Sequence, residues 1–531
     1  MSPSSAAGPT AITASGAAPG QVYKIEPPYY PIVYVRGYAM AASEREETFY
    51  DAYYGFSTTS VEKRQAPPPE YFEADVFEGQ FIRLMKSHGY ADEVNRGLEG
   101  GRGNPSRGIW ICRFYDRDYI REKLRSIEEH AADLDDLVRK RIPARLRDCG
   151  ADLGPNNSDY KVILMAHSMG GLVCRTLIQN ILPAAGEDPK RWVHRLVTMG
   201  SPHRGIELGR IPDFLEDLVT STLNPFDANI FREERMRQYL KLGKEFDVHS
   251  LGPADSPSSY PVKRCLCIIG SDYASYRVAK GLVKEATGNF SDGLVKQDRA
   301  YVVSGPAPPE GQPYAPERKS FWANVHRAHS GYRGIVNSYE SYENIQRFLF
   351  GDTMAEVTLE RIQLNSPLAE DSFYDFEFLF SVRNTGVYLH QMQQDPCENA
   401  QRFARKDLPG RLVLHTGFMN SRFRDPQTPF SHFALKLRVV EHRLRPGLLW
   451  DREYPERPIY NETLEMRIGD LDAAGNTKVE HRWLSEEAGT WQPLQPAADG
   501  VYIVPLRAAG AVSADLALRA SRWPDAKLTG D

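Results

Sequence analysis

The chain has 531 residues, more than one ordinary domain holds, so we expect two or three domains. Hydrophobic residues make up 41% and charged residues 25% of the chain, which is typical of a globular protein in water. The formal net charge of −5 gives no electrostatic basis for binding nucleic acid, and no apolar run is long enough to predict a transmembrane segment.

The N-terminal residues 1–24 are predicted to be a disordered tail. Residues 1–20 are rich in Ala, Ser, Gly, Pro and Thr, and they contain neither a basic residue nor a continuous apolar segment. A secretory signal peptide needs both. We therefore expect a cytoplasmic protein, with export by a route that uses no signal peptide left open. The six cysteines have neither metal nor disulfide spacing and fit a reducing compartment.

Residues 25–353 are predicted to form one α/β domain. Apolar runs alternate with stretches of helical periodicity, which predicts a mostly parallel sheet with helices on both faces. The strands are expected at 31–35, 108–114, 162–166, 194–199 and 262–270. The main helices are expected at 121–146, 170–181 and 338–350.

Two long segments interrupt this alternation. Residues 40–107 form a polar insertion, with a helix expected within 72–87. Between about 206 and 260, apolar residues recur at helical spacing without a strand. We expect this second segment to be a helical lid over the site, although an ordinary surface insertion of helices has the same pattern.

The stretch around Ser168 is the strongest candidate for a catalytic element. The buried strand expected at 162–166 is followed by His167-Ser168-Met169-Gly170-Gly171, and helical spacing begins at Gly170. A serine at a sharp strand-to-helix turn between small residues is typical of a nucleophile elbow. Ala166 stands where the usual motif has its first glycine. A plain helix N-cap after a strand is the alternative interpretation.

A serine nucleophile needs a base, and the base needs an orienting carboxylate. In this type of sheet the chain order is serine, acid, histidine. Asp292, in a short Ser-Asp-Gly turn, is the preferred acid, with Asp272 as its competitor. His329, before Ser-Gly, is the preferred base, with His326 as its competitor.

Two further histidines are assigned structural roles. His203 lies in the Ser-Pro-His-Arg-Gly segment, which we expect to shape the wall of the pocket. His167 is expected to pack beneath the turn at Ser168.

Residues 355–531 are predicted to form a second domain of a different kind. Period-two alternation in 376–382, 433–439 and 463–468, together with five further strand-like runs, predicts about eight short antiparallel strands. A C-terminal all-β sandwich is the expected architecture. The sequence does not show whether this domain binds lipid, glycan or protein, or only braces its neighbour.

Four motifs in order carry a family resemblance. They are Ala166-His167-Ser168-Met169-Gly170-Gly171, Gly200-Ser201-Pro202-His203-Arg204-Gly205, Ser291-Asp292-Gly293 and His329-Ser330-Gly331. Together they resemble the lipase and esterase branch of the α/β-hydrolase superfamily, with motifs similar to those of lipases related to GPI inositol-deacylases. The resemblance covers about residues 28–352 and does not extend into the last third of the chain.

The motifs lead to one mechanistic expectation. A carboxylic ester hydrolase would use Ser168 as nucleophile, Asp292 and His329 as its partners, and the backbone N–H groups of Met169 and Tyr38 for the oxyanion. The resemblance implies lipid-like acyl esters as substrates and contact with a membrane or lipid interface. No metal or organic cofactor is expected. Acyl transfer to an alcohol, or a binding protein with a degenerate hydrolase domain, are the alternatives.

The oxyanion strand departs from the family pattern. Arg36 stands where a histidine usually precedes the glycine of this strand. This departure leaves the geometry of the donor at Tyr38 open.

Overall fold

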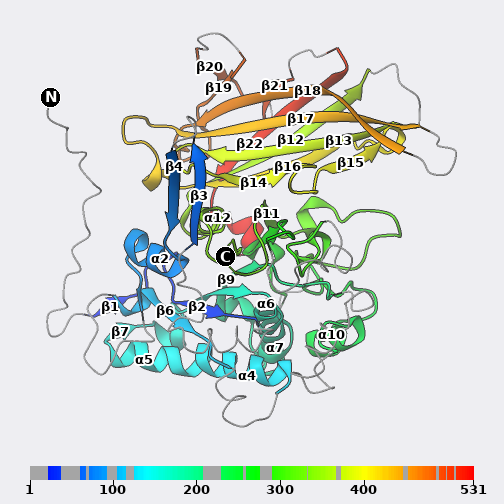
Figure 1. The fold of residues 1–531 in the computed structure, drawn as a ribbon. Helices are drawn as coiled ribbons and strands as arrows, with labels where there is room; N and C mark the ends of the chain where they lie inside the picture. Colours follow the sequence, from blue (N-terminus) through cyan, green and yellow to red (C-terminus); the bar gives the residue numbers. More distant parts are fainter. Residues whose placement is uncertain are drawn as a thin grey trace.

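The fold was analysed in a computed structural model of the chain. It describes residues 22–37, 60–66, 71–92, 104–114, 125–206, 229–254, 259–275, 290–331, 333–365, 372–445, 452–485, 490–497, 499–506 and 510–530. Two parts are visible, a lower part with a parallel sheet and helices and an upper part made of long antiparallel strands (Figure 1).

The lower part is built on a seven-stranded parallel sheet with the strand order β11-β10-β9-β8-β2-β6-β5. Every residue of β2, β8, β9 and β10 is buried, as expected for apolar runs covered on both faces. The strands are β2 (Ile32–Val35), β5 (Ala91–Asp92), β6 (Gly108–Ile111), β8 (Val162–His167), β9 (Val193–Met199), β10 (Cys265–Gly270) and β11 (Phe321–Val325). All five predicted strands of the parallel sheet are therefore confirmed.

Helices cover both faces of this sheet. α4, α5, α6 and α7 lie on one face, and α12 lies on the other, between the sheet and the upper part (Figure 1). The helices are α2 (Gln80–His88), α4 (Ile127–Asp136), α5 (Ile142–Asp148), α6 (Gly170–Thr176), α7 (Leu182–Ala184), α8 (Pro189–Trp192), α10 (Glu233–Leu240) and α12 (Tyr339–Phe350). π-Helical turns η2 (Leu137–Arg141) and η4 (Leu177–Ile181) continue α4 and α6.

Side-chain caps fix where two of these helices begin. Ser126 and Glu129 form a reciprocal capping box at the start of α4. The Ser338 hydroxyl accepts a hydrogen bond from the Ser341 N–H at 3.2 Å, so α12 begins at Tyr339. The predicted helix 338–350 is thus confirmed almost to the residue.

Short elements complete the lower part. β1 pairs in parallel with β7, and β3 pairs with β4 in a hairpin that extends toward the upper part (Figure 1). These strands are β1 (Tyr23–Lys24), β3 (Ser60–Ala66), β4 (Tyr71–Phe77) and β7 (Ala151–Asp152). Single 3₁₀ turns are η1 (Pro105–Arg107), η3 (Pro155–Asn157), η6 (Val262–Arg264), η8 (Gln297–Arg299) and η9 (Pro316–Arg318).

The helix predicted within 72–87 is present but shorter than the window. Phe72, Ala74 and Val76 alternate with polar residues, and this half belongs to β4. The helix α2 occupies only the second half of the window, from Gln80 onward.

The upper part contains two antiparallel sheets. One has the order β16-β12-β22-β21; the other has the order β14-β13-β17-β18-β19-β20, with β15 also paired to β13. Their strands are β12 (Thr353–Leu364), β13 (Phe373–Val382), β14 (Tyr388–Met392), β15 (Gln401–Ala404), β16 (Arg411–Met419), β17 (Ser431–Arg445), β18 (Arg452–Ile468), β19 (Val479–Trp483), β20 (Gln492–Leu494), β21 (Tyr502–Pro505) and β22 (Val512–Arg522). Their inner faces form one hydrophobic core, so this part is the expected β-sandwich. Two 3₁₀ turns, η10 (Arg405–Asp407) and η11 (Ser421–Phe423), lie in its loops.

The end of the chain returns to the lower part. Trp523 lies among Phe321, Phe348 and Phe418, with ring centroids between 4.7 and 5.4 Å from its own. The last helix, α13 (Ala526–Thr529), follows, and its Thr529 carbonyl accepts a hydrogen bond from Arg264 at 2.6 Å. The two parts therefore share an apolar interface.

This architecture is the α/β-hydrolase fold followed by an all-β sandwich domain, as predicted. Residues 207–228 and 255–258 of the predicted lid lie outside the described residues. In the described remainder, α10 packs on the helical layer, where Asn180 donates to the Tyr239 carbonyl at 3.0 Å. The lid therefore stays a prediction.

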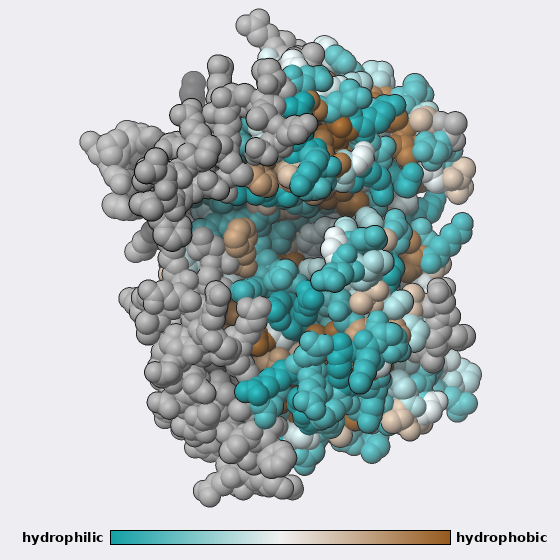
Figure 2. All heavy atoms as spheres, turned by 90° about the vertical axis from the view of Figure 1, so that its right-hand side faces the viewer, coloured by the Kyte–Doolittle hydropathy of each residue, from teal (hydrophilic) through white to brown (hydrophobic). Residues whose placement is uncertain are grey.

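The described surface is mostly polar on the side shown in Figure 2. Hydrophobic residues there form small separate patches between hydrophilic ones. In the ranges that the structure describes, no helix combines the length and hydrophobicity that crossing a membrane requires.

Candidate active site

Ser168 lies at the carboxyl end of the central strand β8, in a strained turn. Its φ is 54°, in the left-handed region that residues with a Cβ rarely adopt. The Ser168 N–H donates to the Met199 carbonyl at 3.0 Å, and its carbonyl accepts from the Gly171 N–H at 3.1 Å. The chain thus turns directly from β8 into α6, with the hydroxyl projecting from the turn.

Glycines allow neighbouring backbone to approach this turn closely. A Cβ on Gly37 would lie 2.4 Å from the Ser168 Cβ and 2.7 Å from the Met169 nitrogen. A Cβ on Gly170 would lie 2.0 Å from the Val35 carbonyl oxygen. The end of β2 therefore lies directly against the turn. Ala166 is fully buried in β8, so alanine fits where the usual motif has glycine.

The structure brings Ser168, His329 and Asp292 together. His329 Nε2 is 3.0 Å from Ser168 Oγ, and His329 Nδ1 is 2.8 Å from Asp292 Oδ2. All three are buried, with 8%, 3% and 1% of their surfaces exposed. They come from three separate loops at the carboxyl edge of the sheet, where sites of such folds are found. Their distances fit proton transfer from the hydroxyl to the imidazole.

Backbone groups hold the carboxylate in place. Asp292 Oδ1 accepts hydrogen bonds from the Leu294 N–H at 3.0 Å and the Val295 N–H at 2.8 Å. The Asp292 carbonyl accepts from the His329 N–H at 2.8 Å, so the acid and base loops are also joined through their backbones. One carboxylate oxygen therefore remains directed at the imidazole.

The competing residues lie outside this group. The Asp272 carboxylate accepts from the Ser275 N–H at 3.0 Å and lies 4.0 Å from the Arg333 guanidinium. His326 Nδ1 is 3.3 Å from the Ser271 hydroxyl. Of each predicted pair, the preferred member belongs to the chain of contacts: His329 contacts Ser168, and Asp292 contacts His329.

Two other buried histidines surround the group without joining it. His167 Nε2 is 2.9 Å from the His329 carbonyl oxygen, and burial holds the pKa of His167 well below its usual value. His203 Nε2 is 3.0 Å from the Thr198 hydroxyl, and burial lowers its pKa in the same way. Both rings are neutral at pH 7. His167 ends β8 directly before Ser168, and His203 lies in the loop after β9; neither ring contacts the Ser168 hydroxyl in the described contacts.

One of the two predicted oxyanion donors is described. The Met169 N–H lies at the start of α6 and has no hydrogen-bond acceptor among the described residues. A helix N-terminus adds a favourable partial charge at this place. Tyr38, the other predicted donor, lies outside the described residues, but its neighbour Gly37 is in contact with the turn. The described residues contain no group of three His, Cys, Asp or Glu side chains suited to a metal ion.

Sequence reasoning missed two glycines in this site. A Cβ on Gly200 would lie 2.8 Å from Asp292 Oδ2, and a Cβ on Gly270 would lie 2.7 Å from the Asp292 Cβ. Each glycine directly follows or ends a strand, at β9 and β10 respectively. Strand-terminal glycines at one sheet edge are the signal that could have identified them.

Comparisons with known proteins give distant matches among solved structures. No family model and no curated protein matches the chain. Among solved structures, phospholipase PlaB from Legionella pneumophila matches at 12% identity over 81% of this chain and 91% of its own, with a TM-score of 0.32. A protein provisionally named as a cell surface hydrolase from Lactobacillus plantarum WCFS1 matches at 14% identity over 54% and 86%, with a TM-score of 0.20.

A third match is confined to a small part of the chain. The structure of the Tle4-Tli4 complex matches at 28% identity with a TM-score of 0.15. This match covers 19% of this chain and 18% of that one, so it spans less than a fifth of either. These three structures do not include a GPI inositol-deacylase, and the closer resemblance to that group stays a prediction.

Proposed function

We propose that this protein is a serine hydrolase of carboxylic acyl esters. The observation that carries the proposal is the continuous chain of contacts from Ser168 Oγ to His329 Nε2 and from His329 Nδ1 to Asp292 Oδ2, at 3.0 and 2.8 Å. The strained turn at Ser168 supports the same assignment, because backbone strain of this kind gathers at functional sites.

In the proposed reaction, His329 accepts the Ser168 proton as the oxygen attacks the ester carbonyl. The carbonyl oxygen gains negative charge, which the Met169 N–H and the predicted Tyr38 N–H stabilise. His329 then gives its proton to the departing alcohol, leaving an acyl group on Ser168. Water, deprotonated by His329, attacks this acyl-enzyme, and His329 returns the proton to Ser168 Oγ as the bond to the acyl group breaks and the acid is released. Asp292 keeps the imidazole oriented and stabilises its charged form throughout.

Replacement of Ser168 tests the proposal directly. Ser168→Ala should remove labelling by a fluorophosphonate probe and reduce hydrolysis of p-nitrophenyl esters on the order of 10⁶-fold. Ser201→Ala is the matched control, because the Ser201 hydroxyl is buried and has no hydrogen-bond partner among the described residues. Turnover that survives in Ser168→Ala but not in Ser201→Ala would overturn the assignment. An absence of labelling in the wild-type protein would favour a degenerate hydrolase domain.

We further propose lipid-like acyl esters as the substrate class. The support is the resemblance of the four ordered motifs to lipases and the predicted lid. The test compares short-chain and long-chain esters, each with and without a lipid–water interface. A higher rate on long chains that rises at the interface is expected. A preference for soluble short-chain esters would contradict the lipid assignment while leaving the esterase assignment intact.

A further inference from the structure

The β-sandwich contacts the loops that carry Asp292 and His329. We propose that it is a positioning element of the catalytic site, with Gln391 of β14 holding the strand end that leads to His329. This inference rests on the proposed serine hydrolase function and assigns a role to a domain for which sequence suggested several.

The first link lies at the edge of the parallel sheet. Among the described strands, β11 pairs with β10 on one side, and β14 of the sandwich lies along its other side. The Asn324 N–H donates to His390 Nδ1 at 3.1 Å, and the His326 N–H donates to Gln391 Oε1 at 3.2 Å. Two side chains of the sandwich therefore satisfy backbone donors that an edge strand otherwise leaves to water.

The state of His390 suits this contact. Burial lowers the pKa of His390 to about 3, so the ring is neutral at pH 7 and its Nδ1 can accept a hydrogen bond. Its ring stacks on His415 at 4.3 Å, which fixes its orientation.

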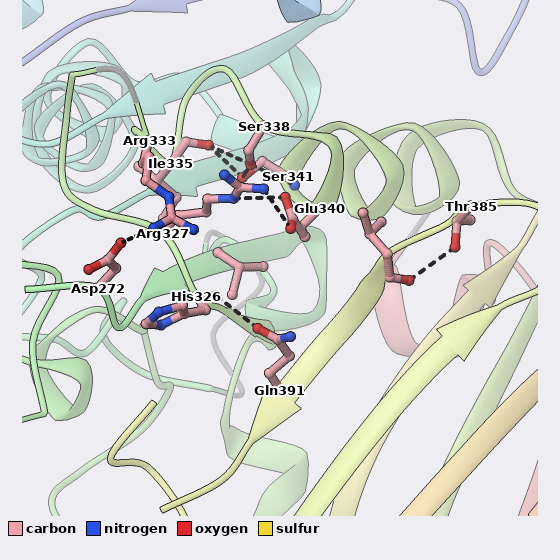
Figure 3. A network of polar contacts seen from close by, with 12 residues as sticks. Asp272, His326, Arg327, Arg333, Ile335, Ser338, Glu340, Ser341, Thr385 and Gln391 are labelled. Atoms are coloured by element: carbon pink, nitrogen blue, oxygen red, sulfur yellow. Dashed lines mark hydrogen bonds and ion pairs between the residues drawn. The ribbon is translucent and has the colours of Figure 1, made fainter. Parts of the chain in front are cut away.

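The segment from His326 to His329 is short, and each of its residues is hydrogen-bonded to another part of the structure. Arg327 forms two hydrogen bonds with Glu340 of α12, at 2.8 and 3.0 Å, and both side chains are largely buried (Figure 3). The Ala328 N–H donates to the Arg333 carbonyl at 3.0 Å, and the His329 N–H donates to Asp292. A displacement at His326 is therefore passed to the imidazole, with no flexible residue between them to absorb it.

A second link reaches the acid loop. Gln297 Nε2 donates to the Cys397 carbonyl of the sandwich at 3.2 Å. The Gln297 N–H donates to the Phe290 carbonyl at 2.9 Å, which closes the loop that contains Asp292. The loops that carry the base and the acid are thus both hydrogen-bonded to the sandwich. Misplacement of reacting groups by about 1 Å can lower rates up to about a hundredfold.

Substitution of Gln391 in the full chain separates positioning from packing. Gln391→Leu keeps the size of the side chain but removes the acceptor, whereas Gln391→Glu keeps an acceptor for the His326 N–H. Gln391→Leu should lower kcat for p-nitrophenyl esters about three- to tenfold with KM unchanged. This is the change in rate that the free energy of one hydrogen bond produces. Gln391→Glu should restore kcat to within about twofold of the wild type. The fluorophosphonate labelling rate should follow kcat in both.

Tyr29→Phe is the matched control. It removes a different hydrogen bond between the two parts, from Arg422 to the Tyr29 hydroxyl at 2.9 Å, which involves neither β11 nor β14. Its kcat should equal that of the wild type. Wild-type kcat in Gln391→Leu, or a loss that Gln391→Glu does not restore, would overturn the positioning role.

Two further readouts keep the outcomes distinct. If Gln391→Leu fails to fold, Gln297→Leu tests the second link with the same expected fall in kcat at constant KM, and wild-type kcat there would overturn the proposal. If the wild-type protein neither labels nor turns over ester, the proposed function itself fails and the positioning role fails with it. A labelled, active wild type with an equally active Gln391→Leu contradicts the positioning role alone.

Discussion

At the scale of single residues, Asp292 has two oxygens with different tasks. Oδ1 is held by two backbone N–H groups, and Oδ2 faces His329 Nδ1. Asp292→Asn keeps the shape but places an amide toward the ring, which favours the tautomer whose Nε2 carries the proton and cannot accept that of Ser168. We expect kcat to fall on the order of 10⁴-fold with an unchanged thermal unfolding midpoint.

The control is Asp272→Asn, at the carboxylate that does not face the imidazole. Steady-state hydrolysis of p-nitrophenyl esters measures both variants, and Asp272→Asn should stay within about twofold of the wild type if only Asp292 orients the base. The reverse pattern would transfer the acid role to Asp272.

Gly37 shows how tightly the turn at Ser168 is packed. A Cβ there would meet the Ser168 Cβ at 2.4 Å and the Met169 nitrogen at 2.7 Å, and neither neighbour can rotate away because both belong to the turn. Gly37→Ala should therefore displace the nucleophile and its oxyanion donor, lowering kcat by about ten- to a hundredfold and the free energy of unfolding by about 1–3 kcal/mol.

Gly410→Ala is the control for this substitution. No atom lies within 4 Å of the Cβ that it adds, so stability and activity should both be retained. Ester hydrolysis and urea unfolding of the two variants provide the measurements. A fully active Gly37→Ala would show that the turn is more compliant than its contacts suggest.

The sequence predicted Ser168, Asp292 and His329 because each lies in a short motif after a strand, in the order that the fold requires. Gly200 and Gly270 were not predicted as site residues, since only the folded chain brings them against Asp292. The choice between His326 and His329 also depended on three dimensions, because the two are three residues apart and only their contacts differ.

At the scale of elements, α2 ends in a histidine that folding keeps out of water. The ring of His88 is fully buried and has no hydrogen-bond partner in the part of the chain that the structure describes. It lies 4.3 Å from the ring of Phe350 and 5.5 Å from that of Phe423. Burial, with a smaller contribution from Arg422 and Arg107, lowers the pKa of His88 to about 3. Native His88 is therefore neutral between pH 5 and pH 7, the range of the measurement below.

The sign of the pH dependence follows. Below the ordinary histidine pKa of about 6.5, the unfolded chain binds a proton that native His88 does not bind until about pH 3. The free energy of unfolding should thus fall by about 1.4 kcal/mol per pH unit for this one group as pH drops through that window. His88→Phe should remove this contribution, so the free energy of unfolding should change with pH less steeply, by up to about 1.4 kcal/mol per pH unit.

Urea unfolding at several pH values between 7 and 5 measures this slope. Tyr90→Phe is the control, since burial raises the pKa of Tyr90 far above this range and its removal should shift stability equally at each pH. An unchanged slope in His88→Phe would mean that the ring already titrates in the native state.

Strands with a clear hydrophobic pattern in the sequence were predicted, whereas a strand that depends on tertiary contacts was not. The strands of the parallel sheet are continuous apolar runs, and the long strands of the sandwich alternate, so both were predicted. β14 was not predicted because Tyr-Leu-His-Gln-Met neither alternates clearly nor forms an apolar run. It is a strand because it pairs with β13 and packs along β11.

At the scale of the whole molecule, composition and the hydrophobic pattern of the sequence predicted two folded parts but not how they contact each other. The core of the lower part includes Met354, Phe418 and Trp523, which come from or adjoin three separate strands of the sandwich. No local pattern connects such distant residues. The contact between β14 and β11 has the same character, so the proposed positioning role could not be derived from sequence.

Trp523 joins the end of the sandwich to the core of the lower part. It is 5% exposed, its indole N–H donates to the Phe348 carbonyl at 2.6 Å, and its ring contacts three phenylalanines. Trp523→Ala should lower the free energy of unfolding by about 3–5 kcal/mol through the lost burial and the cavity. Because Trp523 directly follows a strand of the sandwich but packs in the core of the lower part, the loss should fall on the coupling of the two parts.

The coupling is measurable as cooperativity. We expect the wild type to unfold in urea with coincident transitions by far-ultraviolet circular dichroism and by loss of ester hydrolysis, whereas in Trp523→Ala activity should be lost at a lower urea concentration than secondary structure. Trp523→Phe, which keeps an aromatic ring but not the indole donor, should lie between the two. Coincident transitions in Trp523→Ala would mean that the remaining contacts, among them Arg264 with Thr529, suffice to couple the two parts.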